Sequence, residues 1–230
     1  MLNTLDDYIG HSLPEQGEFT TNPGLGRKVS PDGSFLPFRG NTAVFLLDGG
    51  TRRALRGLQD ELYAAAPDML AERLGEGTFH MTLHDLANGV PGEQGLEGRM
   101  RDTEAKAREL LRMFGGPPLR MRATRLFNMV NTSIVLGLKP ADGDSWRRID
   151  EMYTSLEQVV TLGYALTPHI TMAYFRPGTY GREQVDRLAA ALRAVELELT
   201  LDMGALVLQS FGDMNNYETL GAPHGTDASR

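Results

Sequence analysis

Residues 78–86 read TFHMTLHDL and residues 167–175 read TPHITMAYF, and each stretch places a histidine two positions before a threonine. Threonine, isoleucine and aromatic residues in both stretches favour β-strands. Successive side chains of a strand point to opposite faces, so the histidine and the threonine of each motif share a face. The two stretches therefore predict two strands, each with an apolar face for the core and a polar face.

Strict alternation assigns individual side chains to these faces. The polar face of the first strand is predicted to carry His80, Thr82 and His84. The corresponding face of the second strand is predicted to carry His169 and Thr171. If two such strands pack symmetrically, their polar faces meet at a central groove, where two imidazoles and two hydroxyls flank one ligand.

The segments around the two motifs follow the same order along the chain. In the first half we expect a strand, a helix, the motif strand, a helix and a strand, over 41–48, 51–66, 78–84, 97–114 and 118–127. The second half repeats this order over 131–138, from Ser145 onward, 167–175, 181–194 and 196–202, and a closing strand follows at 205–211. Asn41 lies 39 residues before His80, and Asn131 lies 38 residues before His169. This near-equal spacing predicts an internal duplication of β-α-β lobes related by a pseudo-twofold axis.

The two ends of the chain differ from this pattern. Residues 1–40 contain four prolines and no sustained hydrophobic period, which predicts a largely irregular N-terminal arm. Residues 41–220 are expected to form a single bilobal domain. Residues 221–230 are expected to form a flexible tail.

Composition narrows the class of protein. A chain of 230 residues with 41% apolar residues is long enough for one large domain or two small lobes. No apolar run is long enough to span a membrane, and the acidic N-terminus does not resemble a signal peptide, so we expect a cytoplasmic protein. The absence of cysteine excludes disulfides, thiolate metal sites and a cysteine nucleophile. A net charge of −7 argues against tight binding of long nucleic acid.

Two histidines and two threonines around one groove suit hydrolysis of a cyclic phosphodiester. One neutral imidazole accepts a proton from the attacking water or hydroxyl, and the other, protonated, donates one to the departing ribose oxygen. Histidine fits both tasks because its unperturbed pKa lies near neutrality. The threonine hydroxyls are available to bind the non-bridging oxygens of the phosphate. This scheme requires no metal and no other cofactor.

The pair His80-Met81-Thr82 and His169-Ile170-Thr171 resembles the twin His-x-Thr signature of the two-histidine (2H) phosphoesterase superfamily, which includes RNA cyclic phosphodiesterases of the LigT type. The order of elements extends the resemblance over about residues 41–212. It implies an α+β fold, with antiparallel sheets lining a groove and helices outside. It also implies that His80 and His169 are the acid and the base, and that Thr82 and Thr171 hold the phosphate. The arm ends in Phe38-Arg39-Gly40-Asn41-Thr42, which is similar to a bacterial branch of the superfamily.

Four further residues have two interpretations each. His84 contacts the substrate or lies at the rim without a function. Asn41 and Asn131 line the groove or cap turns. Arg39 meets a phosphate or is simply exposed. A zinc pair made of His80 and His84 would need the glutamate and the helix of an HExxH motif, both of which are missing.

Aromatic residues near the motifs, Phe127, Tyr174 and Phe175, are expected in the core, with stacking on a base as the alternative. The expected partner is a small nucleotide or another small phosphodiester, with no membrane partner, and the oligomeric state is left open. A non-catalytic nucleotide-binding or interaction module on the same fold is the alternative function.

Overall fold

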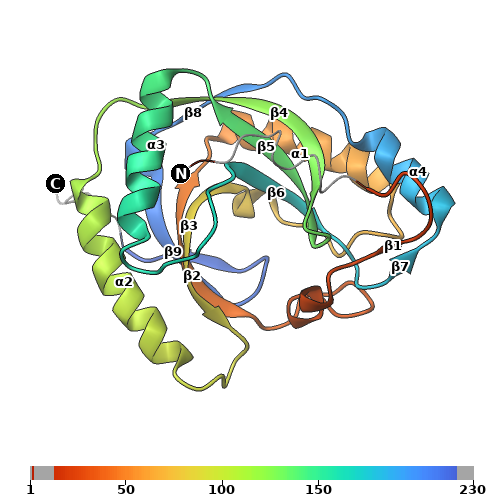
Figure 1. The fold of residues 1–230 in the computed structure, drawn as a ribbon, viewed down its shortest axis with the longest axis horizontal. Helices are drawn as coiled ribbons and strands as arrows, with labels where there is room; N and C mark the ends of the chain where they lie inside the picture. Colours follow the sequence, from red (N-terminus) through yellow and green to blue (C-terminus); the bar gives the residue numbers. More distant parts are fainter. Residues whose placement is uncertain (1, 3–12, 222–230) are drawn as a thin grey trace.

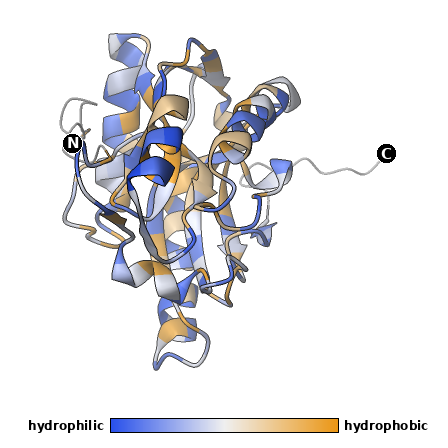
Figure 2. Ribbon diagram, turned by 90° about the vertical axis from the view of Figure 1, so that its right-hand side faces the viewer, coloured by the Kyte–Doolittle hydropathy of each residue, from blue (hydrophilic) through white to orange (hydrophobic). Residues whose placement is uncertain are grey.

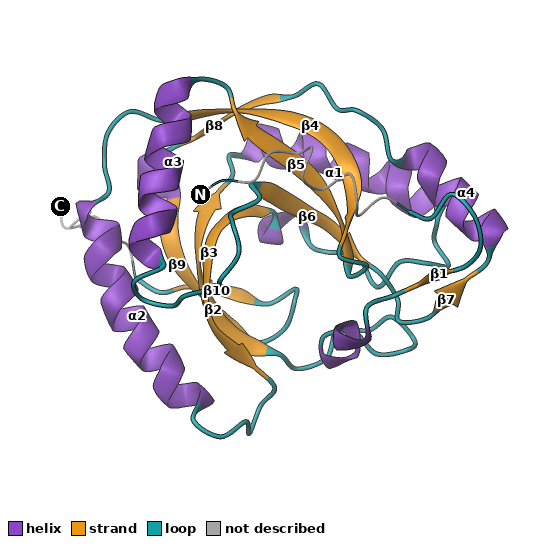
Figure 3. Ribbon diagram, viewed as in Figure 1, coloured by secondary structure: helices purple, strands orange, loops and turns teal. Residues whose placement is uncertain are grey.

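The computed structural model describes residue 2 and residues 13–221, which are organised around one eight-stranded sheet (Figure 1). Its strands are β2 (Arg39–Leu46), β3 (His80–Gly89), β4 (Leu119–Met129), β5 (Ser133–Pro140), β6 (His169–Tyr174), β8 (Glu198–Leu201), β9 (Leu206–Phe211) and β10 (Tyr217–Thr219). They are ordered β10-β9-β2-β3-β6-β5-β4-β8, and every neighbouring pair is antiparallel. The sheet curls into a half-barrel (Figure 3), which confirms the predicted α+β class.

Four α-helices lie outside this sheet in the described part of the chain: α1 (Gly49–Ala65), α2 (Leu96–Met113), α3 (Gly143–Leu156) and α4 (Arg182–Ala191). Helix α1 packs against α4, and α2 packs against α3. Hydrophilic and hydrophobic residues alternate along each helix in Figure 2, as expected for helices with one face on a core. Helix α3 begins at Gly143 rather than at Ser145, and Asp142 caps it by accepting a hydrogen bond from the Ser145 backbone N–H at 2.8 Å.

The duplication is visible in the sheet, because β3 and β6 lie side by side at its centre and pair at Met81 and Ile170. Moving outward, β2 corresponds to β5, β9 to β4, and β10 to β8. The halves also exchange elements. Strand β4 follows α2 in the first half but pairs with β5, whereas β9 follows α4 in the second half but pairs with β2. The two lobes are therefore interlocked rather than separate.

The N-terminal arm is part of the folded body. Its described residues before β2 form short regular pieces: β1 (Phe19–Thr20), which pairs with β7 (Thr179–Tyr180), and the 3-10 helix η2 (Pro23–Arg27). Its apolar side chains join the core cluster and are fully or nearly buried: Leu13, Phe19, Leu25, Val29 and Phe38. The predicted C-terminal tail lies outside the described residues from residue 222 onward. No helix in the described residues combines the length and the apolar content needed to cross a membrane.

Candidate active site

The two motifs meet where β3 and β6 run side by side. Because Met81 pairs with Ile170 in an antiparallel register, His80 lies beside Thr171 and Thr82 lies beside His169. Met81 and Ile170 are fully buried beneath them, as the alternation predicts.

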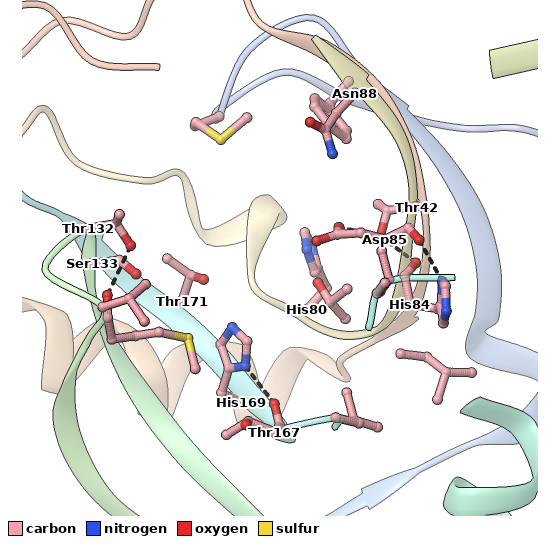
Figure 4. Close-up of a pocket in the computed structure, with 18 of the residues that line it drawn as sticks. Thr42, His80, His84, Asp85, Asn88, Thr132, Ser133, Thr167, His169 and Thr171 are labelled. Carbon is pink, nitrogen blue, oxygen red and sulfur yellow. Dashed lines mark hydrogen bonds between the residues drawn. The ribbon is translucent and has the colours of Figure 1, made fainter. Parts of the chain in front are cut away.

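The four polar residues line one cavity of about 670 Å³. Figure 4 shows the rings of His80 and His169 and the side chain of Thr171 around the same open space. The predicted meeting of the two motifs at a central groove is therefore confirmed.

Strand β3 bulges directly after its motif. Thr82 pairs with Val44 of β2, but the next pair is His84 with Ala43, so Leu83 is an extra residue without a partner. Beyond a bulge the alternation of faces is shifted by one residue. The prediction that His84 shares the face of His80 is therefore wrong, and Asp85 takes that place.

Strand β6 bulges at the equivalent position. Thr171 pairs with Val135 of β5, the next pair is Ala173 with Ile134, and Met172 is the extra residue. The shift brings the following residue, Tyr174, to the cavity wall, where it is partly buried and also packs against the core. Since Leu83 and Met172 are both fully buried, the two bulges fill the core in the same way.

His84 is among the residues that line the cavity, but its ring makes structural contacts. Its side chain is 0% exposed, its Nε2 lies 3.1 Å from Oε1 of Glu157, and its Nδ1 lies 2.5 Å from the carbonyl oxygen of Asp85. Its ring also packs against Tyr153 of α3 with 5.0 Å between centroids. Both ring nitrogens have partners within the protein, so of the two interpretations of His84 the contacts favour the one without a substrate role.

Asn41 joins α2 to the sheet instead of lining the groove. Its Nδ2 donates to the carbonyl oxygen of Met100 at 2.8 Å, and its Oδ1 accepts from the Ala87 backbone N–H at 2.9 Å. Asn41 itself is buried, and it is not among the residues that line the cavity.

Asn131 and Arg39 also point elsewhere. Asn131 has a φ of 59° in the turn between β4 and β5 and donates from Nδ2 to the carbonyl oxygen of Thr20 at 3.2 Å, so the turn interpretation fits. Arg39 Nη1 lies 2.5 Å from Glu97 Oε1 at the surface. Neither residue lines the cavity, so the turn interpretation of Asn131 and the exposed interpretation of Arg39 are the ones that fit.

Several cavity residues were missed by sequence reasoning, namely Lys28, Thr42, Asn88, Thr132, Ser133 and Tyr217. Thr42 and Ser133 occupy equivalent positions, because Thr42 pairs with Asp85 and Ser133 with Tyr174. The repeated Asn-Thr at 41–42 and 131–132 was the available signal for this edge. In both copies the threonine lines the cavity and the asparagine does not.

The environments of the two catalytic candidates differ. Burial and, to a lesser extent, the nearby His169 ring lower the pKa of His80 to about 4. A hydrogen bond with the Thr78 backbone raises this pKa and so opposes part of the shift. Burial also lowers the pKa of His169, but a hydrogen bond with the Thr167 backbone and the charge of Asp85 both oppose this effect. Nδ1 of His169 lies 2.7 Å from the Thr167 carbonyl oxygen and donates to it, which leaves Nε2 for the cavity.

Potential metal ligands do not gather in the described part of the chain: no three histidine, aspartate or glutamate side chains come together there. Asp85 is the carboxylate on the cavity wall near the motifs, and its partner is the hydroxyl of Thr42 at 3.4 Å.

Solved structures with a similar fold identify the fold of the chain. No protein-family model and no curated protein matches it. The conserved protein of unknown function ATU0111 from Agrobacterium tumefaciens is 20% identical, with a TM-score of 0.64 over 97% of this chain and 100% of that chain. Escherichia coli LigT complexed with 3′-AMP is 10% identical, with a TM-score of 0.51 over 80% of this chain and 96% of that one. TT0787 of Thermus thermophilus is 16% identical, with a TM-score of 0.50 over 79% and 95%. The chain therefore has the LigT-like fold of the 2H phosphoesterases.

Proposed function

We propose that this chain is a phosphodiesterase that hydrolyses a cyclic phosphate on a small nucleotide-like substrate. The observation that carries the proposal is the quartet of His80, Thr82, His169 and Thr171, brought onto one cavity wall by the register of β3 and β6. Two imidazoles that flank one phosphate supply both proton transfers that ring opening requires.

In this reaction a water molecule attacks the cyclic phosphorus while one imidazole takes its proton. A new P–O bond forms, the bond from phosphorus to one ribose oxygen breaks, and the second imidazole gives its proton to that oxygen. The hydroxyls of Thr82 and Thr171 donate hydrogen bonds to the non-bridging oxygens, where negative charge accumulates in the transition state.

The different surroundings of the two rings support an assignment of roles. His80 is the base, because burial and the nearby His169 ring favour its neutral form. His169 is the acid, because Asp85 and the Thr167 carbonyl favour its protonated form over that of His80. The anionic substrate adds to this preference by stabilising a proton on the ring nearest the departing oxygen.

The cavity favours a mononucleotide-sized substrate. Its volume of about 670 Å³ lies in the range of small-molecule sites. Aromatic side chains on its wall, Phe38, Tyr174 and Tyr217 among them, offer faces on which a base can stack. The 3′-AMP bound by LigT, a protein of the same fold, is a ligand of this size.

The test is hydrolysis of 2′,3′-cyclic AMP, followed by phosphorus NMR so that 2′- and 3′-phosphate products are distinguished. Reactions with EDTA are expected to run at the same rate as those without, because the mechanism takes its protons from histidines. The matched control is a protein in which His80 and His169 are both alanine. If the wild type binds 3′-AMP but opens no cyclic phosphate, the non-catalytic nucleotide-binding alternative holds instead.

A further inference from the structure

The part of the arm from residue 20 to residue 38, here called the strap, spans both halves of the molecule. Near its start, the Asn22 backbone N–H donates to the Asn131 carbonyl oxygen at 2.9 Å, and Asn22 Nδ2 donates to the Val130 carbonyl oxygen at 3.3 Å. At its end, the Phe38 backbone N–H donates to the Gly212 carbonyl oxygen at 2.9 Å. The strap therefore runs from the β4–β5 turn of one half to the β9–β10 connection of the other.

Lys28 is the strap residue that brings a charge to the cavity. Among the described residues that line the cavity it is the sole lysine or arginine, and it forms no ion pair with any described residue. Its Nζ lies 4.8 Å from the centroid of the Phe38 ring, which also lines the cavity. The adjacent Arg27 points outward and pairs with Glu93 at 3.2 Å.

The position of Lys28 along the groove separates it from the catalytic quartet. His80 begins β3, whereas the strap joins β2 at Arg39, opposite Gly89 at the other end of β3. Asp85, whose charge acts on Lys28, lies five residues beyond His80 and three beyond Thr82, or roughly 16 and 10 Å at the rise of a strand. Lys28 thus lies at the strap end of the cavity, away from the cyclic phosphate.

The surroundings of Lys28 favour the binding of an anion. Burial lowers the pKa of its ammonium, and Asp85 opposes this shift without reaching ion-pair distance. Lys28 is half-buried, and an ammonium with no hydrogen-bonded partner among the described residues gains from a ligand that brings a negative charge to it.

We propose that Lys28 binds a second anionic group of the substrate, a terminal phosphate on the end opposite the cyclic phosphate, and that the strap closes the groove there. The proposal rests on the proposed function for the identity of the reacting end. The substrate class it names is a nucleoside cyclic phosphate that also carries a 5′-phosphate.

The experiment measures binding, so that it does not depend on turnover. Isothermal titration calorimetry compares 3′-AMP with adenosine 3′,5′-bisphosphate on the wild-type chain, on Lys28→Met and on Arg27→Met. We expect the wild type to bind the bisphosphate about tenfold more tightly or better, since a hydrogen bond to a charged group is worth at least that factor. Lys28→Met should lose this preference, and Arg27→Met, which removes a neighbouring charge outside the cavity, should keep it.

Two results overturn the proposal. One is a wild type that binds both ligands equally while Lys28→Met melts at a lower temperature, which would make Lys28 a structural partner of Asp85. The other is a preference that survives in Lys28→Met. The proposed function fails in a different way. If the chain prefers the bisphosphate through Lys28 but opens neither 2′,3′-cyclic AMP nor its 5′-phosphorylated form, the anion site at Lys28 stands and the proposed hydrolysis is wrong.

Discussion

The two motif strands present the same residues up to their bulges and different residues beyond them. The first strand continues from its bulge into His84 and Asp85, and the second continues into Ala173 and Tyr174. In the proposed reaction, the repeated part binds the phosphate. The unrepeated part gives each histidine its own surroundings, so a site with twofold geometry acquires two chemically distinct ends.

Asp85 illustrates this difference. Its carboxylate faces the cavity from the first half and favours a proton on His169, the ring of the opposite half. At the equivalent position the second half places Tyr174, a neutral side chain that offers no such charge to His80. Symmetry is therefore broken by one charge rather than by the backbone.

The largest expected effect comes from removing either ring. His80→Ala and His169→Ala should each lower turnover of 2′,3′-cyclic AMP by about 10² to 10⁴-fold, which is the usual contribution of a positioned proton-transfer group. Because both groups act in one step, the double variant should be much less than multiplicatively worse. Steady-state kinetics on protein with a wild-type circular dichroism spectrum measures this. A single variant that keeps near wild-type turnover would contradict the two-histidine mechanism.

Removing either threonine hydroxyl should have a smaller effect. Thr82→Val and Thr171→Val each remove one hydrogen bond to a charged group, worth about 1.5–3 kcal/mol, and should lower kcat/KM by about 10 to 100-fold. The matched control is Thr42→Val on the same cavity wall, whose hydroxyl already donates to the His84 carbonyl oxygen at 3.1 Å. An equal loss in the control would show that these hydroxyls act through the fold rather than on the phosphate.

The pH profile sharpens the comparison between the two rings. The base must be neutral, so kcat/KM should rise with pH through the pKa of His80, at about 4. The acid must be protonated, so kcat/KM should fall as pH rises through the pKa of His169, which lies below 6.5. The bell should therefore peak below pH 6.5 and fall about tenfold per unit on its alkaline side. A peak above pH 8 would rule out the assigned surroundings of both rings.

Making the first strand like the second should affect stability more than catalysis. His84→Ala copies the residue of the second half and removes the buried bond to Glu157, so we expect a loss of about 1–3 kcal/mol in the free energy of unfolding. Urea denaturation measures this loss. Glu157→Gln keeps an acceptor oxygen toward His84 and should cost less. If turnover by folded His84→Ala drops as far as turnover by His80→Ala, His84 takes part in the reaction.

Much of this arrangement could be predicted from the sequence, because the motifs and helices have local signals. The helix expected over 97–114 is α2 (Leu96–Met113), and the strand expected over 118–127 is β4 (Leu119–Met129). The bulges could not be predicted, because Leu83 and Met172 are ordinary core residues whose sequence looks like an unbroken strand. Trp146 has helical spacing with the buried Ile149 and Tyr153, which alone would place it in the core, yet it is 39% exposed near the start of α3.

Residues that enter the cavity from irregular segments carry no periodic signal at all. Lys28 follows a short 3-10 helix in the arm, and Tyr217 starts a three-residue edge strand. Their places depend on contacts between segments far apart in the chain, such as the packing of Tyr217 on the His80 ring with 5.0 Å between centroids. Spacing within one half cannot reveal such contacts.

The exchange of strands between the halves has a consequence for synthesis of the chain on the ribosome. The edge of β2 is covered by β9, whose residues Leu206–Phe211 are translated about 160 residues after β2 itself. Until then the nascent protein carries an open strand edge next to an apolar face, the kind of surface that pairs with other chains. A chain stopped before residue 206 would therefore be prone to aggregation even though it contains both His-x-Thr motifs.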